Sequence, residues 1–543
     1  MRRSGKVIAG MAVGLVAIGA AWVWLRRHAE PIARERIVES LEAKLHCAVE
    51  LDEVHLSLAH GLEVTGRGLR IMAIGNRVRI SPGGTPMLTV REFQFASTLK
   101  DLLLHHESAI TAYAQGLVIT LPAGTDREKL DQSDPKRRNQ PRDSYFLNKL
   151  VATESLLRLE PTDRTKANIE FDFKKLVLVD PGKDVPFVFE TILRNPMPSG
   201  EIHATGHIGP WVFGSSRDSP VDGNFTFDHA DLSDVKGLNG TLTAHGRIAG
   251  SLGQMTVHGE TETPDFGLDI SAHTFPLHTE FQALVEGTTG DVALQSVAAR
   301  FLHTELEGNG LIRKVLAADG KETKGHNIAI DVHMKNGRAE DLLTLFSRSP
   351  EPLLRSPMDL QGHVEVPPGK ERLVLKMRAS GTAQIGAAHF TNVNLQQSVN
   401  AFSLRAQDVH QAKQAIQDPG ASPVVAMSLS GPFRIVGGNI EMPDVTSRAP
   451  GAVLAMQGRY PLVERELQFH GVARTVAPAD HMETGIKSLL LKPVSPFLHK
   501  NGAGTQLPIS FMGDKGHPVF HLDLKNHGED GKVAEKSHTN LKP

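Results

Sequence analysis

The sequence predicts a mainly β protein that begins with one transmembrane helix and contains few other, short helices. Three observations support this prediction. Residues Val7–Leu25 form an unbroken uncharged run, and from Val49 onward apolar and polar residues alternate with a period of two. A short unit of the form apolar-x-Gly-x-apolar also recurs, without a fixed spacing.

Composition argues against several classes of function. The chain has 543 residues, with 59 Lys+Arg against 61 Asp+Glu, so it lacks the positive excess of a nucleic-acid-binding protein. Its single cysteine excludes a disulfide framework or a cysteine-based zinc ribbon. Only 5% of its residues are aromatic, which does not favour a surface that stacks sugars or bases. The sequence contains no Walker A loop, GxSxG, HExxH or CxxC, so we expect no enzyme, cofactor or metal.

The uncharged run is expected to anchor the protein in a membrane. At about 1.5 Å per residue, a helix of this length just crosses a hydrocarbon core of about 30 Å. A cleaved signal peptide is the alternative, but its apolar part would usually be about 7–15 residues long. Residues 1–6 would form a short cytoplasmic tail. The predicted anchor residues include Val7, Leu15, Trp22, Trp24 and Leu25.

The remaining chain divides by pattern. We expect an N-terminal region over 31–123, a charged mobile loop over 124–144 and a central region of strands over 145–335. A C-terminal region follows over 336–525, and a disordered tail over 526–543. Apolar spacing typical of short helices occurs at 31–45, 98–106, 338–347, 392–406 and 480–492.

Local alternation predicts which side chains share an apolar face. These candidates are Ile169, Phe171, Phe173, Phe225, Phe227, Leu373, Leu375 and Met377. The 26 histidines are interpreted as residues of the polar face. His203 and His207, for example, would lie about 13 Å apart on one strand, too far for a single zinc ion.

A sheet with one apolar face must cover that face. With few helices available, two sheets could pack as sandwiches, or one long sheet could curl into a channel whose apolar face holds lipid tails. The residue pattern alone favours neither arrangement.

The order of the segments resembles the AsmA family of inner-membrane-anchored periplasmic proteins, relatives of TamB. The similar segments in the N-terminal region are KLHCAVELDEVHLSLAHGLEVTGRGLRI and REFQFASTLKDLLLHHESAITAYAQGLVITLPAG. Those in the C-terminal region are RAEDLLTLF, MDLQGHVEV, MRASGTAQIGAAHFTNVNLQQSVNAFSLRAQ and the closing GTQLPISFMGDKGHPVFHLDL. Over 145–335 the resemblance is looser.

The resemblance implies a long twisted antiparallel β-groove, taco-like in section, that carries glycerophospholipids toward the outer membrane without chemical catalysis. The helix would sit in the inner membrane of a Gram-negative-type bacterium, with the bulk of the chain in the periplasm. Strands that lie across such a groove add about 4.8 Å each, so roughly 25–30 strands would extend on the order of 120–145 Å.

Two alternatives remain open. The far end would meet the outer membrane or a docking protein there, and the candidate contact residues are Leu489, Leu490, Leu491, Phe497 and Leu498. The same residues could instead belong to a helix that caps the edge of the sheet.

The second candidate function is an assembly factor or scaffold for outer-membrane proteins, with its apolar face closed by protein.

Overall fold

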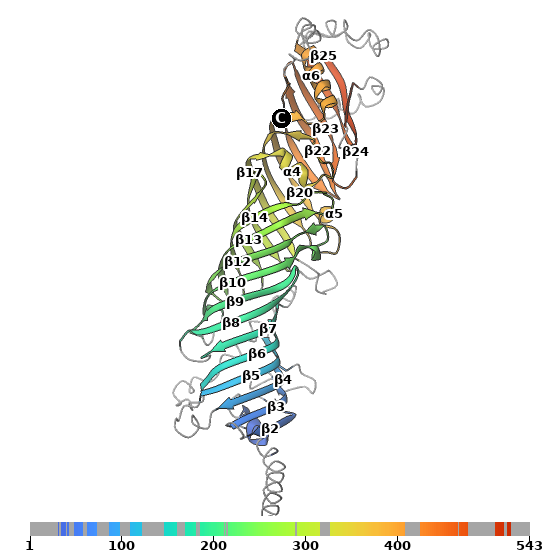
Figure 1. Ribbon diagram of the computed structural model, residues 1–543. Coiled ribbons are helices and arrows are strands. Elements are labelled where there is room, and N and C mark those ends of the chain that lie inside the picture. Colours follow the sequence, from blue (N-terminus) through green and yellow to red (C-terminus); the bar gives the residue numbers. More distant parts are fainter. Residues whose placement is uncertain are drawn as a thin grey trace, which may run out of the picture.

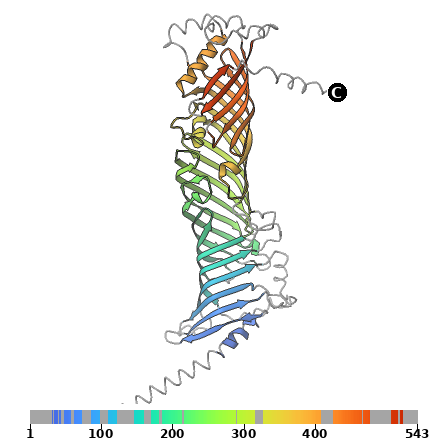
Figure 2. The ribbon, with the colours of Figure 1, turned by 90° about the vertical axis from the view of Figure 1, so that its right-hand side faces the viewer.

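The alternating residues form strands, and these join in one long sheet that curls into a half-barrel (Figures 1 and 2). The computed structural model describes residues 31, 34–39, 41–42, 48–57, 62–72, 86–97, 109–121, 146–159, 169–180, 185–210, 212, 216–287, 290–314, 326–407, 424–464, 466–475, 505–514 and 518–522. Within these ranges there are 26 strands, as many as the sequence leads one to expect. A single curled sheet, rather than a sandwich of two sheets, is therefore observed.

The elements follow one another across the sheet in nearly the order of the chain. In the first half the strands are β1 (Val49–Glu50), β2 (Glu53–Ser57), β3 (Leu62–Ile71), β4 (Leu88–Ser97), β5 (Ala109–Leu121), β6 (Phe146–Leu159), β7 (Ile169–Val179), β8 (Phe187–Pro196), β9 (Ser199–Ile208), β10 (Pro220–Asp231), β11 (Leu238–Asn239), β12 (Thr241–Ser251) and β13 (Gln254–Leu268). The second half contains β14 (Phe275–Val285), β15 (Val292–Phe301), β16 (Thr304–Arg313), β17 (Asn327–Arg338), β18 (Leu354–Arg355), β19 (Pro357–Val366), β20 (Arg378–Phe390), β21 (Met427–Val436), β22 (Asn439–Ala449), β23 (Ala452–Pro461), β24 (Glu466–Thr475), β25 (Thr505–Asp514) and β26 (Val519–Leu522).

Helices are few, as predicted. They are α4 (Ala339–Leu345), α5 (Leu373–Lys376) and α6 (Val393–Gln407), with 3-10 turns η2 (Ser216–Asp218) and η3 (Leu232–Asp234). Residues 34–39 and 41–42 are also helical, in agreement with the amphipathic pattern after the predicted anchor. The helices expected near 338–347 and 392–406 are confirmed as α4 and α6.

Neighbouring strands pair antiparallel along most of the sheet. The exception is β5 with β6, which pair in parallel from Ala109 opposite Phe146 to Leu121 opposite Leu159. Parallel neighbours enter the sheet from the same edge, so the chain must return to that edge between them. The residues that join these two strands include the predicted charged loop 124–144, which lies outside the described residues.

The strand register places apolar residues opposite one another from strand to strand. One row runs through directly paired residues of β10 and β12–β16, namely Phe225, Gly246, Gly259, Phe281, Val297 and Gly308. Directly paired residues lie on the same face of a sheet, and alternate residues of a strand return to that face. The register therefore collects the apolar side chains of many strands on one face.

Glycine and phenylalanine share this row for a packing reason. The Cβ of an alanine at Gly246 would lie 2.7 Å from Cε1 of Phe225, and one at Gly259 would lie 2.7 Å from Cζ of Phe281. Each glycine thus accepts a phenyl ring from the neighbouring strand. This close approach accounts for the glycine in the apolar-x-Gly-x-apolar unit of residues 244–248. At Gly206 and Gly381, in other copies of the unit, a Cβ would instead meet backbone atoms of the neighbouring strand.

The apolar face is the concave one. Leu268 of β13, Ile435 of β21 and Leu467 of β24 belong to one buried cluster, although many strands separate them in the sheet. Only the inner side of a curled sheet can bring such distant strands together. Helix α6 packs on the same side, where its Leu395 and Val399 meet β21, β23, β24 and β25.

One strand prediction was wrong. Leu373 and Leu375 were expected to alternate on a strand, but they lie in helix α5, and Leu375 is 42% exposed while Val374 between them is buried. Pro367 and Pro368 precede this segment, and prolines lack the N–H needed to extend the β19–β20 ladder. The ladder starts only where Arg378 pairs with Glu365.

Several predictions lie outside the described residues. These are the anchor Val7–Leu25, the short helices at 98–106 and 480–492, the candidate contact residues between 486 and 498, and the tail 526–543. Among the helices that the structure describes, none is both long and apolar enough to cross a membrane.

We predict that Gly259→Ala lowers the free energy of unfolding by about 1–3 kcal/mol, because its Cβ would overlap the ring of Phe281. Chemical denaturation measures the loss. Adding Phe281→Leu should recover part of it, because a smaller side chain then faces the new methyl group. Ser296→Ala on the opposite face should stay within about 0.5 kcal/mol of the parent. Equal losses at positions 259 and 296 would contradict this packing.

Candidate functional site

The concave face is the candidate functional site, and most of the predicted apolar residues that can be placed lie on it. The rings of Phe171 and Phe173 in β7 are 6.5 Å apart, on one face of the strand. Phe173 pairs with Leu193 of β8, which pairs with Ile202 of β9, which in turn pairs with Phe227 of β10. The register therefore connects the predicted residues of β7 with those of β10.

Two further predicted residues fit this arrangement. Phe225 lies two residues before Phe227 on the same face, and both are half-buried. Ile169 begins β7 and pairs with Leu159, and its side chain lies outside the described set.

From β8 to β17 the concave face is uncharged and mostly apolar at its paired positions, and its polar members are threonines such as Thr191, Thr261 and Thr279. Phe189, Ala204, Val221, Ile248, Val257, Leu306 and Val332 all occupy it, together with the glycines and phenylalanines of the row above. Many of these side chains, such as Phe225 and Phe281, are only half-buried. Helices α4 and α5 share a buried cluster with Phe266 and Leu268 of β13, but no described helix shares one with the row from Phe225 to Gly308. A long aliphatic surface with partial solvent access results.

The concave face continues into the C-terminal half, where it encloses a cavity of about 460 Å³. This volume lies within the range of about 300–1,000 Å³ that is common for small-molecule sites. Apolar side chains from β16 to β26 and from helices α4 and α6 line nearly all of it. The predicted residue Met377 lies in this wall, just before β20.

Residues of this cavity that local alternation did not select include Phe433, Phe469 and Phe511. Each is the apolar member of an alternating strand segment, so a longer alternation search would have found them. The ring of Phe469 lies 6.5 Å from that of Phe511, to which it is directly paired.

Buried polar groups fix the two helices over the concave face. Asp341 of α4 is 4% exposed, and its carboxylate accepts hydrogen bonds from the backbone N–H of His303 and the hydroxyl of Thr304. In α6, Gln396 accepts from the N–H of Phe390 and donates to the carbonyl of Val425. Satisfied groups of this kind specify position, because a buried polar atom without its partner is costly.

Burial also affects the one tyrosine of this region, Tyr460, whose pKa is raised to about 12 by loss of solvent. Its side chain therefore stays neutral at physiological pH and contributes no charge to the apolar wall.

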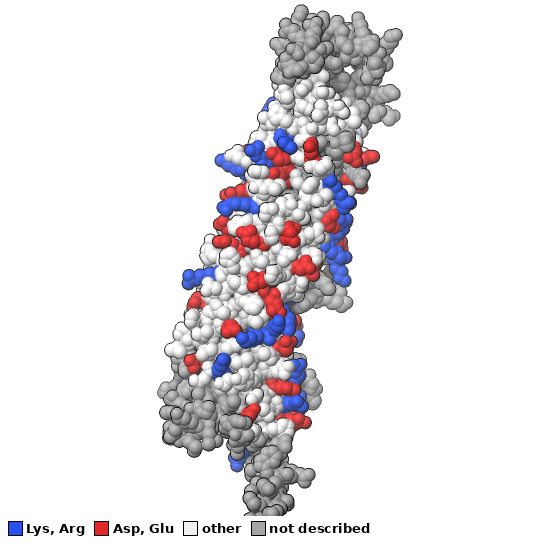
Figure 3. All heavy atoms as spheres, viewed as in Figure 1, with Lys and Arg blue, Asp and Glu red and all other residues white. Residues whose placement is uncertain are grey.

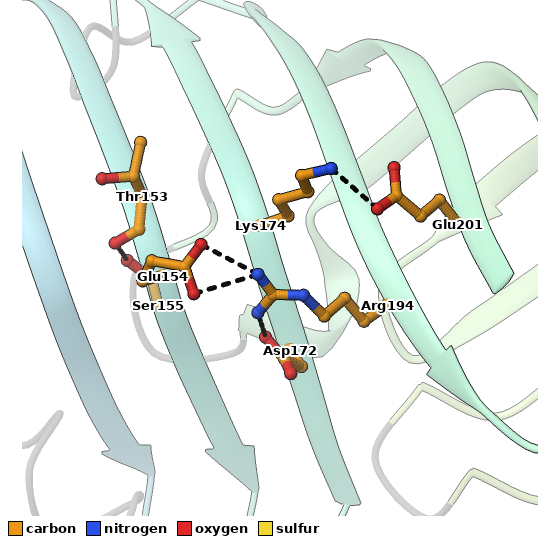
Figure 4. Close-up of polar contacts among 7 residues, drawn as sticks. All are labelled: Thr153, Glu154, Ser155, Asp172, Lys174, Arg194 and Glu201. Carbon is orange, nitrogen blue, oxygen red and sulfur yellow. Dashed lines mark hydrogen bonds and ion pairs between the residues drawn. The ribbon is translucent and has the colours of Figure 1, made fainter. Parts of the chain in front are cut away.

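The convex face has the opposite character. Figure 3 shows acidic and basic side chains interspersed over the surface. In one exposed network, Arg194 of β8 lies between Glu154 of β6 and Asp172 of β7, and Lys174 pairs with Glu201 of β9 (Figure 4). Hydrogen bonds from Arg194 lower the pKa of Glu154. Exposed ion pairs like these add little stability, and they keep the convex face hydrated.

The described strand histidines alternate with the apolar row and so lie on the convex face, in agreement with the sequence interpretation. His207 faces Asp222 at 3.6 Å, His245 faces Glu260 at 3.7 Å, and His363 faces Asp331 at 2.8 Å. The described residues contain no group of three or more His, Cys, Asp or Glu side chains arranged to hold a metal.

A hollow of about 990 Å³ also lies on this polar side, lined by side chains such as His258 and Glu307. It is an open depression between side chains of mixed charge. The concave face is the better candidate because its lining has one chemical character along many strands.

We predict that the imidazole of His278 titrates above its ordinary pKa of 6.5, because the hydrogen bonds that its ring donates to the carboxylates of Glu262 and then Glu280 favour its charged form. The stabilisation is fully present below the ordinary value and is lost as pH rises through the raised pKa. Histidine NMR titration measures it. Glu262→Gln should lower the pKa of His278, whereas Glu190→Gln, whose carboxylate pairs with Lys175, should leave it unchanged. If Glu262→Gln leaves the pKa of His278 unchanged, the result would contradict this contact.

The chain matches no protein-family model and no curated protein sequence. Its function is therefore inferred from the contrast between the two faces of the sheet and from the resemblance of its segments noted in the sequence.

Proposed function

We propose that the protein is a lipid conduit, which holds the acyl chains of glycerophospholipids on its concave face and moves them without chemical catalysis. The observation that carries this proposal is the uncharged aliphatic surface that continues from strand to strand while the opposite face stays polar. Acyl chains are flexible and unbranched, so a lining of Gly, Ala, Val, Ile, Leu and Phe suits them.

The energetics support a conduit rather than a catalyst. Exposing an acyl chain to water costs roughly 0.8 kcal/mol per CH₂ group. Two ordinary chains would therefore oppose passage through water by on the order of 20 kcal/mol. A continuous apolar face removes that barrier by physical cover alone.

The proposal extends to the setting that the sequence suggests. We place the chain in the AsmA family, with residues 7–25 in the inner membrane and the sheet in the periplasm. The far end would then meet the outer membrane or a docking protein there. The uncharged run, the curled sheet and the resemblance of the segments support this placement together.

A second candidate function has one observation in its favour. In the C-terminal half, helices α4 and α6 lie over the concave face, so protein covers part of the apolar surface there. A scaffold that assists the assembly of outer-membrane proteins would show such protein cover along the whole sheet. The row from Phe225 to Gly308 favours the conduit, because no described helix shares a buried cluster with these residues, although α4 and α5 share one with Leu268 of β13.

We predict that a photoreactive benzoylphenylalanine at Phe225 captures phospholipid, whereas the same group at Thr226 does not. The two positions are adjacent on β10 and point to opposite faces, so they differ in environment but hardly in location. Irradiation of the full chain in phospholipid vesicles, followed by mass spectrometry, measures the adduct. Equal lipid capture at both positions would contradict the proposed conduit function.

We also predict that Val297→Glu slows lipid transfer between vesicles at least tenfold, because a carboxylate on the apolar path must be desolvated beside each passing acyl chain. Ser296→Glu is the matched control on the exposed convex face and should transfer at the parent rate. Circular dichroism checks that both variants keep their strands. Transfer unaffected by Val297→Glu in a folded chain would exclude this route.

A further inference from the structure

The curled sheet has two long edges, where successive strands turn. The turn from β13 to β14, helix α4 and helix α6 lie on the first edge. The turn from β12 to β13 and helix α5 lie on the second edge. Cargo that slides along the concave face with a polar headgroup in water needs an open gap between these edges.

At one level the two edges touch. Lys236, beside β11 on the first edge, accepts a hydrogen bond of 2.7 Å through its carbonyl from the N–H of Leu373 on the second edge. Asp269, just after β13, forms an ion pair of 2.7 Å with Arg372, which is 103 residues away in the chain. We call these four residues the clasp. Figure 1 shows α5 on this side of the sheet, next to the green turns.

The backbones approach closely at the clasp. A Cβ at Gly237, where φ is +104°, would lie 3.0 Å from the backbone nitrogen of Leu373. Beneath it, Leu268 and Ile270 of the first edge share a buried cluster with Val374 of α5. The clasp therefore closes the concave face into a tube at this level.

The first edge is held firmly, and the second edge less so. The hydroxyl of Ser271 donates to the carbonyls of Thr344 and Ser347, and Arg348 donates to the carbonyl of Asp269. These contacts tie the segment after β13 to the segment after α4. The second edge meets the first through Arg372, whose side chain is 37% exposed. Its partner Asp269 on the first edge is 31% exposed, so water reaches the ion pair.

From this geometry we infer that the clasp is a gate, which must open for a two-chain phospholipid to pass from the half-barrel of β8–β17 into the C-terminal half. This inference rests on the proposed conduit function. Acyl chains can pass beneath the clasp through apolar surroundings. A headgroup that moves in the gap between the edges is blocked by the Lys236–Leu373 hydrogen bond and the Asp269–Arg372 ion pair. Opening breaks one backbone hydrogen bond and one half-exposed ion pair, and it also separates the buried Val374 of α5 from Leu268 and Ile270 of the first edge.

The gate can be tested by locking it. In a full chain whose single cysteine is replaced through Cys47→Ser, Asp269→Cys and Arg372→Cys are joined by a short bifunctional methanethiosulfonate reagent, which a reductant cleaves. Benzoylphenylalanine at Phe225 or at Phe433 reports lipid before and beyond the clasp. The matched control joins Arg217→Cys to Glu286→Cys, an ion pair of 3.0 Å that lies wholly on the second edge.

We expect the lock to lower phospholipid capture at Phe433 at least tenfold, to leave capture at Phe225 unchanged, and to be reversed by reductant. The control cross-link should change neither position. If phospholipid is captured at both positions with the cross-link in place, the gate is wrong but the proposed conduit function is not contradicted. Absence of capture at both positions before cross-linking would overturn the conduit, and the gate with it.

Discussion

The structure depends on one constraint: the strand register must keep most of the apolar side chains on the same face of the sheet. A slip of one residue in any strand would turn its apolar set outward. The irregular positions respect this constraint. In β10 the residues between Phe227 and Ala230 form a bulge, after which Ala230 pairs with Leu242 and remains buried. The bulge accommodates two polar residues, Asp228 and His229, so that the apolar residues after it still lie on the concave face.

The second consequence concerns the inside of the curl. A strongly curled sheet leaves little room on its concave side, and glycines that lie under phenyl rings provide that room. A few rings suffice, which explains why a chain with only 5% aromatic residues can still cover its concave face. The convex face has no such limit and carries the charged and histidine side chains, whose ion pairs hold neighbouring strands in register.

Local sequence patterns predicted the parts of this structure that depend on neighbouring residues alone. Alternation placed Phe171 with Phe173, and Phe225 with Phe227, because one strand suffices to define a face. It failed at Leu373 and Leu375, where two prolines end the ladder and the following residues form one turn of helix, which buries Val374 between them. The contact of Asp269 with Arg372 could not be predicted, because it depends on how many strands the sheet needs to bring one edge back to the other. Glycine units predicted repeated strands, but not the phenyl rings that the glycines accept.

The central claim is that lipid covers the concave face from β8 to β17. Cryo-electron microscopy of the full chain in a phospholipid bilayer disc tests this claim most directly. We predict elongated acyl-chain density against the row from Phe225 to Gly308, with headgroup density confined to the gap between the two edges. A concave face that is empty of lipid over these strands, or filled there by polypeptide, would contradict it.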